Sequence, residues 1–366
     1  MGASHKKVVM AMSGGVDSST AAALLKRQGH EVVGATLMLP FYREGTSTGS
    51  AESRSDGIES ARRVAAGLGI PLHVLDVRRE FRETVVADFC RAYGEGKTPN
   101  PCVRCNVWIK FGRLLQEAKA LGARFVATGH YARKSLDADT GRSVLLAGRG
   151  ADDQSYFLFG LSQDQLQQAL FPLGDYTKDQ VRRMATELGL SVSDRPDSQD
   201  LCFVPQGKYR EFLMAQRPDA FRPGPIVHVS GKILGEHKGI GAYTIGQRRG
   251  LGIAYAEPLY VAGFEPERNA VLVGERQHIL RKEITVAEVN WVAVPPPSRP
   301  LRASVKVRST DAGAEAEVVP LADDRVRIEF AQPQEAPCPG QAAVFYRGPV
   351  VLGGGIIQNT LEPREK

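Results

Sequence analysis

Residues 8–20 read VVMAMSGGVDSST, and this stretch decides the fold. An apolar run, Val8 to Met12, leads into the loop Ser13–Ser18, and residues at helical spacing follow. A buried strand, a glycine turn and a helix in this order aim successive backbone N–H groups at one point, the positive end of the helix. Glycines let that backbone approach a ligand without a Cβ in the way. The stretch therefore predicts a phosphate site at the first turn of an α/β domain.

The same loop excludes two common nucleotide-binding motifs. It lacks the Gly-Lys-Ser/Thr ending of a Walker P-loop, and it lacks the GxGxxG of a dinucleotide fold. Ser13, Ser18 and Ser19 add hydroxyl donors, and Asp17 could orient the loop or hold Mg²⁺. The alternative interpretation is a tight strand-to-helix turn that binds nothing.

Outward from this loop, short apolar runs alternate with helical patterns. In order they are Val8–Met12, Ser19–Gln28, Val32–Leu37, Ile58–Leu68, Leu72–Val77, Phe81–Tyr93, Ile109–Leu121 and Phe125–Thr128. Such alternation predicts an α/β domain with a parallel sheet covered by helices, and we assign it residues 1–206. Residues 42–56 are rich in Gly, Ser and Thr and predict a loop. Thr177–Gln180 predicts a capping box that opens a helix ending at Gly189.

The pattern changes after about Gln206. Gly and Pro punctuate short apolar runs such as Ile226–Val229 and Leu259–Phe264, which is typical of β structure. Later runs, Ala303–Val307, Arg325–Phe330 and Ala342–Tyr346, suggest a small barrel. We therefore expect a central β-rich domain over residues 207–278 and a C-terminal β-barrel over 279–366.

Composition limits the classes of protein to consider. With 366 residues, 42% apolar and 24% charged, the chain is typical of a soluble globular protein of two or three domains. Its net charge of +6 favours a polyanionic partner, although many basic proteins bind no nucleic acid. No run approaches the roughly 18 consecutive apolar residues of a membrane helix, and the N-terminus carries no export signal. We expect a cytoplasmic protein with no membrane association.

The cysteines are Cys90, Cys102, Cys105, Cys202 and Cys338, an odd number that argues against a disulfide framework. Cys102 and Cys105 have the spacing of half a zinc site or of a redox pair. Because no second CxxC or nearby His pair completes a metal site, we expect no structural metal. A small buried hydrophobe is the alternative for Cys202, and it describes Cys90 and Cys338 well.

The loop resembles the pyrophosphate-binding (PP) loop of N-type ATP pyrophosphatases, which split ATP into AMP and pyrophosphate while adenylating an oxygen. Nearly the whole chain resembles the bacterial tRNA-specific 2-thiouridylase (MnmA) family. The motifs that carry this resemblance are Ala11–Ser18, Thr98–Cys102 with Cys105-Asn106, Ala127–Tyr131, Asp153–Leu158, Tyr243–Gly252 and Pro339–Tyr346. The resemblance implies ATP-dependent sulfur transfer to the 2-position of the wobble uridine of tRNA. Adenylated uracil and a cysteine persulfide are the implied intermediates, and AMP and pyrophosphate are released.

The resemblance also implies the roles of two cysteines. It makes Cys105 the nucleophile and Cys202 the persulfide carrier, which forms a transient disulfide with Cys105. Such a bond requires the two Cα atoms to come within about 7 Å. Since a free thiol is mostly protonated at neutral pH, a nearby cation should lower its pKa, and Arg104 and Lys110 are candidates.

The remaining implied site residues fall into three groups. Those expected to bind ATP, with Mg²⁺, are Ala11, Met12, Ser13, Gly14, Gly15, Val16, Asp17, Ser18, Met38 and Gly129. Those expected to face the target base are Asn100, Pro101 and Cys102. Those expected to bind tRNA are His130, Asp152, Asp153, Gln154, Arg308, Ser309 and Gln341. The implied partners are tRNA and a sulfur donor protein, either a cysteine desulfurase or a relay carrier.

The residues themselves leave alternatives open. Without the resemblance, His130 is more often a satisfied core histidine and Gln341 an ordinary turn residue. Cys102 stands where some family members carry an Asp with a proposed acid–base role, and Asp152 replaces a more usual Lys. Ser309–Ala312 lacks the aromatic and basic residues often found there. Two other functions remain: an adenylating ligase for a small molecule, and a catalytically silent RNA-binding module.

Overall fold

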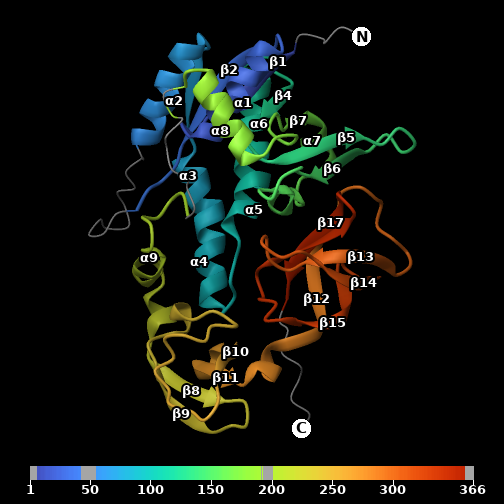
Figure 1. Cartoon of the computed structure of the whole chain (residues 1–366). Coiled ribbons are helices and arrows are strands. Elements are labelled where there is room, and N and C mark those ends of the chain that lie inside the picture. The colour runs from blue at the N-terminus through green and yellow to red at the C-terminus, as the bar shows by residue number, and fades with distance from the viewer. Residues whose placement is uncertain (1–5, 43–54, 191, 193–200, 359–366) are drawn as a thin grey trace. The chain divides into compact units, whose positions relative to one another are not determined.

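The computed structural model describes residues 6–42, 55–190, 192 and 201–358 (Figure 1). The chain forms two compact units, and neither is continuous in sequence. The first consists of Met1–Val85, Cys102–Gln206 and Gly348–Leu352, and the second of Val86–Pro101, Gly207–Arg347 and Gly353–Lys366. The domain boundaries near 206 and 278 stay a prediction. Most of the loop expected over 42–56 lies outside the described residues.

The first unit is built on a five-stranded sheet in the order β3-β2-β1-β4-β7, in which every neighbouring pair is parallel. Its strands are β1 (Lys7–Ala11), β2 (Glu31–Met38), β3 (Leu72–Asp76), β4 (Phe125–Ala127) and β7 (Ala169–Leu170). The central strand is apolar throughout because both faces of a parallel sheet are covered, and Val8, Val9 and Met10 are wholly buried. The α/β fold class predicted from the alternating pattern is confirmed.

Helical segments of the first unit surround this sheet. They are α1 (Val16–Arg27), α2 (Ser55–Leu68), α3 (Arg78–Phe81), η1 (Arg82–Val86, continuing into the second unit), α5 (Pro101–Cys105), η2 (Asn106–Arg113), α6 (Leu114–Ala120), η3 (Ser155–Leu158), α7 (Gln163–Gln168) and α8 (Lys178–Glu187). Helix α8 packs against α1 (Figure 1). Its predicted capping box is present, since the side chains of Thr177 and Gln180 each accept the other's backbone N–H.

An antiparallel hairpin in the first unit was not predicted. Strands β5 (Ala132–Leu136) and β6 (Ser143–Ala147) pair with each other, and Leu146 lies opposite Val350, the first residue of β17 (Val350–Ile357). The Ala147 N–H also donates to the Pro349 carbonyl at 2.7 Å. The alternating strand and helix pattern missed the hairpin because β5 is half polar and exposed at its end.

Close backbone packing at Gly174 gives a stability prediction. A Cβ at this position would stand 1.9 Å from the carbonyl oxygen of Ala132, which is backbone and cannot rotate away. We expect Gly174→Ala to lower the free energy of unfolding by about 1–3 kcal/mol or more, measured by urea denaturation. Gly67→Ala in α2 is the control, because a Cβ there meets nothing within 4 Å. An unchanged midpoint for Gly174→Ala would contradict this packing.

The second unit contains a mixed four-stranded sheet in the order β10-β11-β8-β9. These strands are β8 (Gly224–His228), β9 (Ile233–His237), β10 (Tyr260–Glu265) and β11 (Ala270–Gly274). β11 and β8 run parallel, and the other pairs are antiparallel. The helical segments of this unit are α4 (Ala87–Gly94), α9 (Tyr209–Gln216), η4 (Pro218–Phe221), η5 (Ile240–Ala242), η6 (Pro266–Arg268) and η7 (Arg276–Ile279).

A closed barrel completes the second unit. Its strand order is β12-β15-β14-β13-β16-β17, and pairing of β12 with β17 closes it. The strands not yet described are β12 (Leu280–Trp291), β13 (Leu301–Lys306), β14 (Ala314–Pro320), β15 (Val326–Glu335) and β16 (Ala342–Arg347). Closure removes the exposed edges that an open sheet would present. The C-terminal barrel expected from the sequence is confirmed.

Candidate active site

The loop Ser13–Ser18 connects β1 to α1, as the sequence predicted. Gly14 has φ +76°, and a Cβ there would meet the Gly57 carbonyl oxygen at 2.4 Å, so this turn requires glycine. The Ser18 hydroxyl lies inside the loop, where it accepts the Ser13 N–H at 3.2 Å. The first N–H groups of α1 have no partner within the helix and carry partial positive charge, so the end of the helix beside this loop is suited to bind an anion.

Neighbouring elements fix this loop in place. The Ser60 hydroxyl of α2 donates to the Gly14 carbonyl at 2.9 Å. Gly129, which follows β4, lies so close that a Cβ would stand 3.0 Å from the backbone of Asp17 and Ser18. The site therefore lies at the carboxyl end of β1, where the strand order reverses between β2 and β4. Ligands of open α/β sheets bind at this kind of position.

The other residues expected to bind ATP lie at the same edge of the sheet. Ala11 is the last residue of β1, and Met12 follows it and is buried. Met38 is the last residue of β2, and neighbouring parallel strands end at a shared edge. The structure therefore brings together the ends of β1, β2 and β4 with the loop, which is the arrangement that the ATP-site prediction requires.

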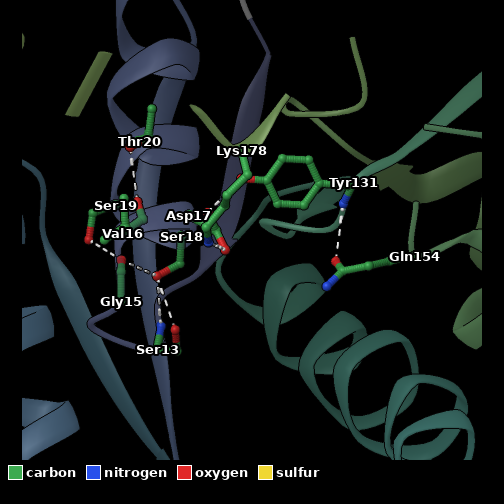
Figure 2. A network of polar contacts seen from close by, with 10 residues as sticks. All are labelled: Ser13, Gly15, Val16, Asp17, Ser18, Ser19, Thr20, Tyr131, Gln154 and Lys178. Carbon is green, nitrogen blue, oxygen red and sulfur yellow. Dashed lines mark hydrogen bonds and ion pairs between the residues drawn. The ribbon is translucent and has the colours of Figure 1, made fainter. Parts of the chain in front are cut away.

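Asp17, in the first turn of α1, is held by two residues from distant parts of the chain (Figure 2). Lys178 places its ammonium 2.8 Å from Oδ1 and 2.7 Å from Oδ2 of Asp17. The Tyr131 hydroxyl donates to Oδ1 at 2.7 Å. The carboxylate is thus oriented at the loop, and a cation lies directly beside it.

Sequence reasoning missed Lys178, although a signal was present. Lys178 is the first residue of α8, directly after the recognised capping residue Thr177. A positive side chain in the first turn opposes the helix macrodipole, so a lysine there suggests a specific anionic partner. Its partner Asp17 is 161 residues away in the chain, which no local pattern could indicate.

The turn expected to touch RNA is tied to the same network. The Gln154 Oε1 accepts the Tyr131 N–H at 3.2 Å (Figure 2). Asp153 accepts backbone N–H groups of Gly148 and Ser155 at 2.9 and 3.0 Å. Asp152 is exposed. The Asp153 carboxylate and the side-chain Oε1 of Gln154 therefore accept backbone N–H groups that fix this turn. RNA contact by the turn stays a prediction.

Two of the cysteines named as site residues share one short helix. Cys102 and Cys105 both lie on α5, and residues three apart in a helix lie on the same side. Cys105 is buried, whereas Cys102 is exposed. The pKa of the Cys105 thiol is raised to about 11, chiefly by burial and in smaller part by the neighbouring Cys102, against the lowering effect of Lys110. The pKa of the exposed Cys102 thiol is also raised, chiefly by desolvation.

The structure places Cys202 within electrostatic range of both α5 cysteines. Desolvation, and then Cys105 and Cys102, raise the pKa of the Cys202 thiol to about 12 against the lowering effect of Lys110. Cys202 itself is an exposed residue. Much of the segment before Cys202, residues 193–200, lies outside the described residues.

Among the residues that the structure describes, Lys110 is the cation whose charge acts on this cluster. Its charge lowers the pKa of Cys102, Cys105 and Cys202, opposing the effect of burial. Arg104, the other candidate, lies over the Trp108 ring, with its guanidinium carbon 5.2 Å from the ring centre. Lys110 is therefore the better placed of the two to stabilise a thiolate.

His130 lies next to Lys110. Its Nε2 is 3.5 Å from the Lys110 ammonium, and its Nδ1 is 2.7 Å from the Thr128 hydroxyl. Burial, and then the positive charge of Lys110, holds the pKa of His130 well below its usual value. The imidazole is therefore neutral at physiological pH, and contact between His130 and tRNA stays a prediction.

The remaining expected contacts can be placed within the second unit or at its boundary. Arg308 donates to the carbonyls of Glu335 and Ala336 at 3.1 and 2.7 Å, and Ser309 follows it. Gln341 donates to the Thr98 carbonyl at 3.0 Å. Of the residues expected at the target base, Asn100 directly precedes α5 and Pro101 is its first residue. Arg308 and Gln341 thus hold backbone segments together, and the RNA contacts of all these residues stay predictions.

In the ranges that the structure describes, no group of three or more His, Cys, Asp or Glu side chains could hold a metal ion. In those same ranges no helix combines the length and the apolar character needed to cross a membrane.

Comparisons with known proteins agree with this geometry. The family model of the tRNA methyl transferase HUP domain matches residues 6–206. The tRNA methyl transferase PRC-barrel domain matches residues 210–275, and the aminomethyltransferase beta-barrel domain matches residues 281–357.

Relatives that match nearly the whole chain support the same family. The tRNA-specific 2-thiouridylase MnmA of Syntrophotalea carbinolica is 49% identical over 354 residues, which cover 96% of this chain and 99% of that one. The protein of that name from Roseiflexus castenholzii is 48% identical, covering 96% and 99% of the two chains. The one from Geotalea uraniireducens is 46% identical, covering 98% and 97%. The chain belongs to the tRNA-specific 2-thiouridylase (MnmA) family.

Proposed function

We propose that this chain is a tRNA-uridine 2-sulfurtransferase, which uses ATP to replace the 2-oxygen of the wobble uridine with sulfur. One observation carries the proposal: the phosphate loop and the cluster of Cys102, Cys105 and Cys202 belong to the same compact unit. A nucleotide-activating site and a set of thiols are the two parts that such a reaction needs. A protein that only bound RNA would need neither.

ATP binds, in this proposal, with its phosphates at the first turn of α1. The N–H groups of Ser13–Ser18 and the Lys178 ammonium supply positive charge there. Mg²⁺ usually takes one or two protein carboxylates and fills its other positions with water and substrate phosphates. Asp17 fits that need, because it is a carboxylate at the loop, and an arriving cation would replace Lys178 beside it. The Mg²⁺ ion would neutralise part of the negative charge on the phosphates.

Sulfur transfer then uses Cys105 and Cys202, the two cysteines to which the family resemblance gives catalytic roles. ATP adenylates the uracil 2-oxygen with loss of pyrophosphate, while Cys202 carries the donated sulfur as a persulfide. The Cys105 thiolate attacks the Cys202 sulfur, forming a Cys105–Cys202 disulfide and releasing hydrosulfide. Hydrosulfide adds to the activated carbon and expels AMP, and an external dithiol reduces the disulfide.

The high thiol pKa values have a consequence for this scheme. With pKa values of about 11 and 12, Cys105 and Cys202 are protonated at neutral pH in the unliganded protein. Idle thiols are thereby protected from oxidation, since the thiolate is the reactive form. Cys102 occupies the position of an acidic residue in some relatives, and its thiol is also protonated, so it is suited to donate rather than to accept a proton.

The tRNA contacts are proposed on the family resemblance. They are Asn100, Pro101 and Cys102 at the base, and His130, Asp152, Asp153, Gln154, Arg308, Ser309 and Gln341 along the RNA. A net charge of +6 is favourable for a polyanionic substrate. The sulfur comes from a donor protein, either a cysteine desulfurase or a relay carrier.

The test combines purified protein, ATP, Mg²⁺, unmodified tRNA and sulfide. We expect 2-thiouridine in the digested tRNA by mass spectrometry, with AMP and pyrophosphate formed in equal amounts. The competing hypothesis, a small-molecule adenylating ligase, predicts ATP–pyrophosphate exchange that needs no tRNA. Exchange at full rate without tRNA, together with no 2-thiouridine, would refute the proposed function.

A further inference from the structure

The helical stretch that carries the cysteines changes its winding directly after Cys105. It begins as α5, becomes the π-helix η2 over Asn106–Arg113, and ends as α6. In an α-helix, residues four apart share a face. In a π-helix the hydrogen bonds run between residues five apart, so those residues come to share a face instead. Such segments are rare and concentrate at functional sites.

The spacing of five matters for one pair of residues. Lys110 is five residues after Cys105, so the π winding turns its side chain back toward the cysteine face. The electrostatic effects agree, because the Lys110 charge acts on Cys105, Cys102 and Cys202. Its ammonium is also 3.5 Å from Nε2 of His130, which fixes the side to which it points. A regular α-helix would rotate Lys110 away from Cys105.

A second segment holds the π winding from outside. The Gln165 Nε2 donates to the carbonyl of Val107 at 2.9 Å and to that of Phe111 at 3.0 Å. Gly112 is needed at the same place, since a Cβ there would stand 2.9 Å from the Val107 oxygen. Gln165 thus ties two carbonyls of η2 together through one side-chain amide.

Gln165 is itself held by a capping box. It is the third residue of α7, and its Oε1 accepts the backbone N–H of Ser162 at 3.0 Å. The Ser162 hydroxyl accepts the Gln165 N–H in return. Both ends of the Gln165 amide are therefore engaged, one in α7 and the other in η2. Through Gln165, the start of α7 is thus connected directly to η2.

We propose that Gln165 is a positioning residue for sulfur transfer: it keeps η2 in its π form, so that Lys110 stays with the cysteines and stabilises the Cys105 thiolate when it forms. This inference rests on the proposed function, in which Cys105 must lose its proton before it attacks. Among the described residues, Lys110 and Cys102 are the groups whose charges shift the pKa of Cys105, and Cys105 in turn shifts the pKa of Cys202. Cys202 is protonated and His130 is unprotonated at neutral pH, so both are neutral there and Lys110 supplies the charge.

The test measures the thiolate directly, in ligand-free protein. Iodoacetamide alkylates a thiolate, whose sulfur forms a bond to carbon as iodide leaves. The rate at Cys105 is followed by peptide mass spectrometry across pH. For Lys110→Met we expect the apparent pKa of Cys105 to rise by about one unit, and hence about tenfold slower alkylation at a fixed pH below it. Lys110→Arg should retain most of the wild-type rate.

Gln165→Met should shift the apparent pKa of Cys105 in the same direction, by about half as much as Lys110→Met or more. Ser162→Ala is its matched control, because it breaks the same capping box in α7 but leaves the Gln165 Nε2 able to donate to η2. We expect Ser162→Ala to keep the wild-type pH profile. Circular dichroism verifies that each variant is folded.

Two results would overturn the inference. One is a wild-type pH profile at Cys105 in folded Gln165→Met; the other is an equal shift in Ser162→Ala, which would make the effect one of α7 stability alone. Should Gln165→Met fail to fold, the Lys110→Met and Lys110→Arg pair still decides whether this cation acts on Cys105. Since alkylation needs neither ATP nor tRNA, a failure to form 2-thiouridine would refute the proposed function without changing this measurement.

Discussion

Replacing Cys202 or Cys105 with serine is expected to lower the rate of 2-thiouridine formation by at least about 10³-fold, the scale seen when a covalent nucleophile is removed. A serine hydroxyl cannot carry a persulfide, nor can it close a disulfide. ATP activation uses the loop at α1 instead of the thiols, so tRNA-dependent release of pyrophosphate should persist in both variants. These variants are assayed with a cysteine desulfurase and cysteine as the sulfur source, because free sulfide would add to the activated carbon without either thiol. Mass spectrometry of the tRNA and a pyrophosphate assay then measure the two steps separately.

Cys90→Ala is the control for these variants. Cys90 is buried and belongs to the second unit, whereas Cys102, Cys105 and Cys202 belong to the first, so the proposed reaction gives it no role. We expect this variant to form 2-thiouridine at close to the wild-type rate. Retained thiolation in both Cys105→Ser and Cys202→Ser would exclude the two-cysteine mechanism.

Lys178→Met should weaken binding of ATP by about 10- to 100-fold, since hydrogen bonds to charged groups contribute about 1.5–3 kcal/mol. The Lys178 ammonium lies 2.7 Å from Asp17 at the first turn of α1, where the phosphates are proposed to bind. Equilibrium binding of ATP, followed by isothermal titration calorimetry, gives the affinity. Lys119→Met, at an exposed position of α6, is the control for loss of a lysine.

A comparison with Asp17→Asn separates two roles for Lys178. If Lys178 only neutralises Asp17, adding Lys178→Met to Asp17→Asn should cause no further loss of affinity. If Lys178 binds phosphate itself, the double variant should bind more weakly than Asp17→Asn alone. The first outcome would contradict the proposed phosphate contact.

The parts of the fold that sequence predicted are those set by local pattern. Continuous apolar runs such as Val8–Met12 indicated buried parallel strands, because both faces of the sheet are covered. Thr177 and Gln180 indicated the start of α8 by their spacing alone. The barrel followed from short, evenly punctuated runs. In each case the decisive interactions lie within a few residues or repeat along one element.

The parts that sequence missed depend on distant contacts. The helical pattern of 101–120 did not predict the π winding, and the Gln165 amide that contacts it is 58 positions beyond Val107. The bond between Asp17 and Lys178 spans an even longer stretch. Lys110 was named as a candidate, but its choice over Arg104 needed the contact of Arg104 with Trp108. The loop at α1 was predictable because its chemistry is local.

The double membership of the last strand affects how the protein is made. Val350 pairs with Leu146 in the first unit, whereas the end of β17 closes the barrel of the second. A ribosome therefore releases most of the first unit well before the short segment Gly348–Leu352 that completes it. During translation, the edge of β6 that later pairs with β17 is therefore unpaired until the end of the chain is made. In a fragment ending at residue 206 this edge would stay unpaired, and an unpaired strand edge can pair with another chain.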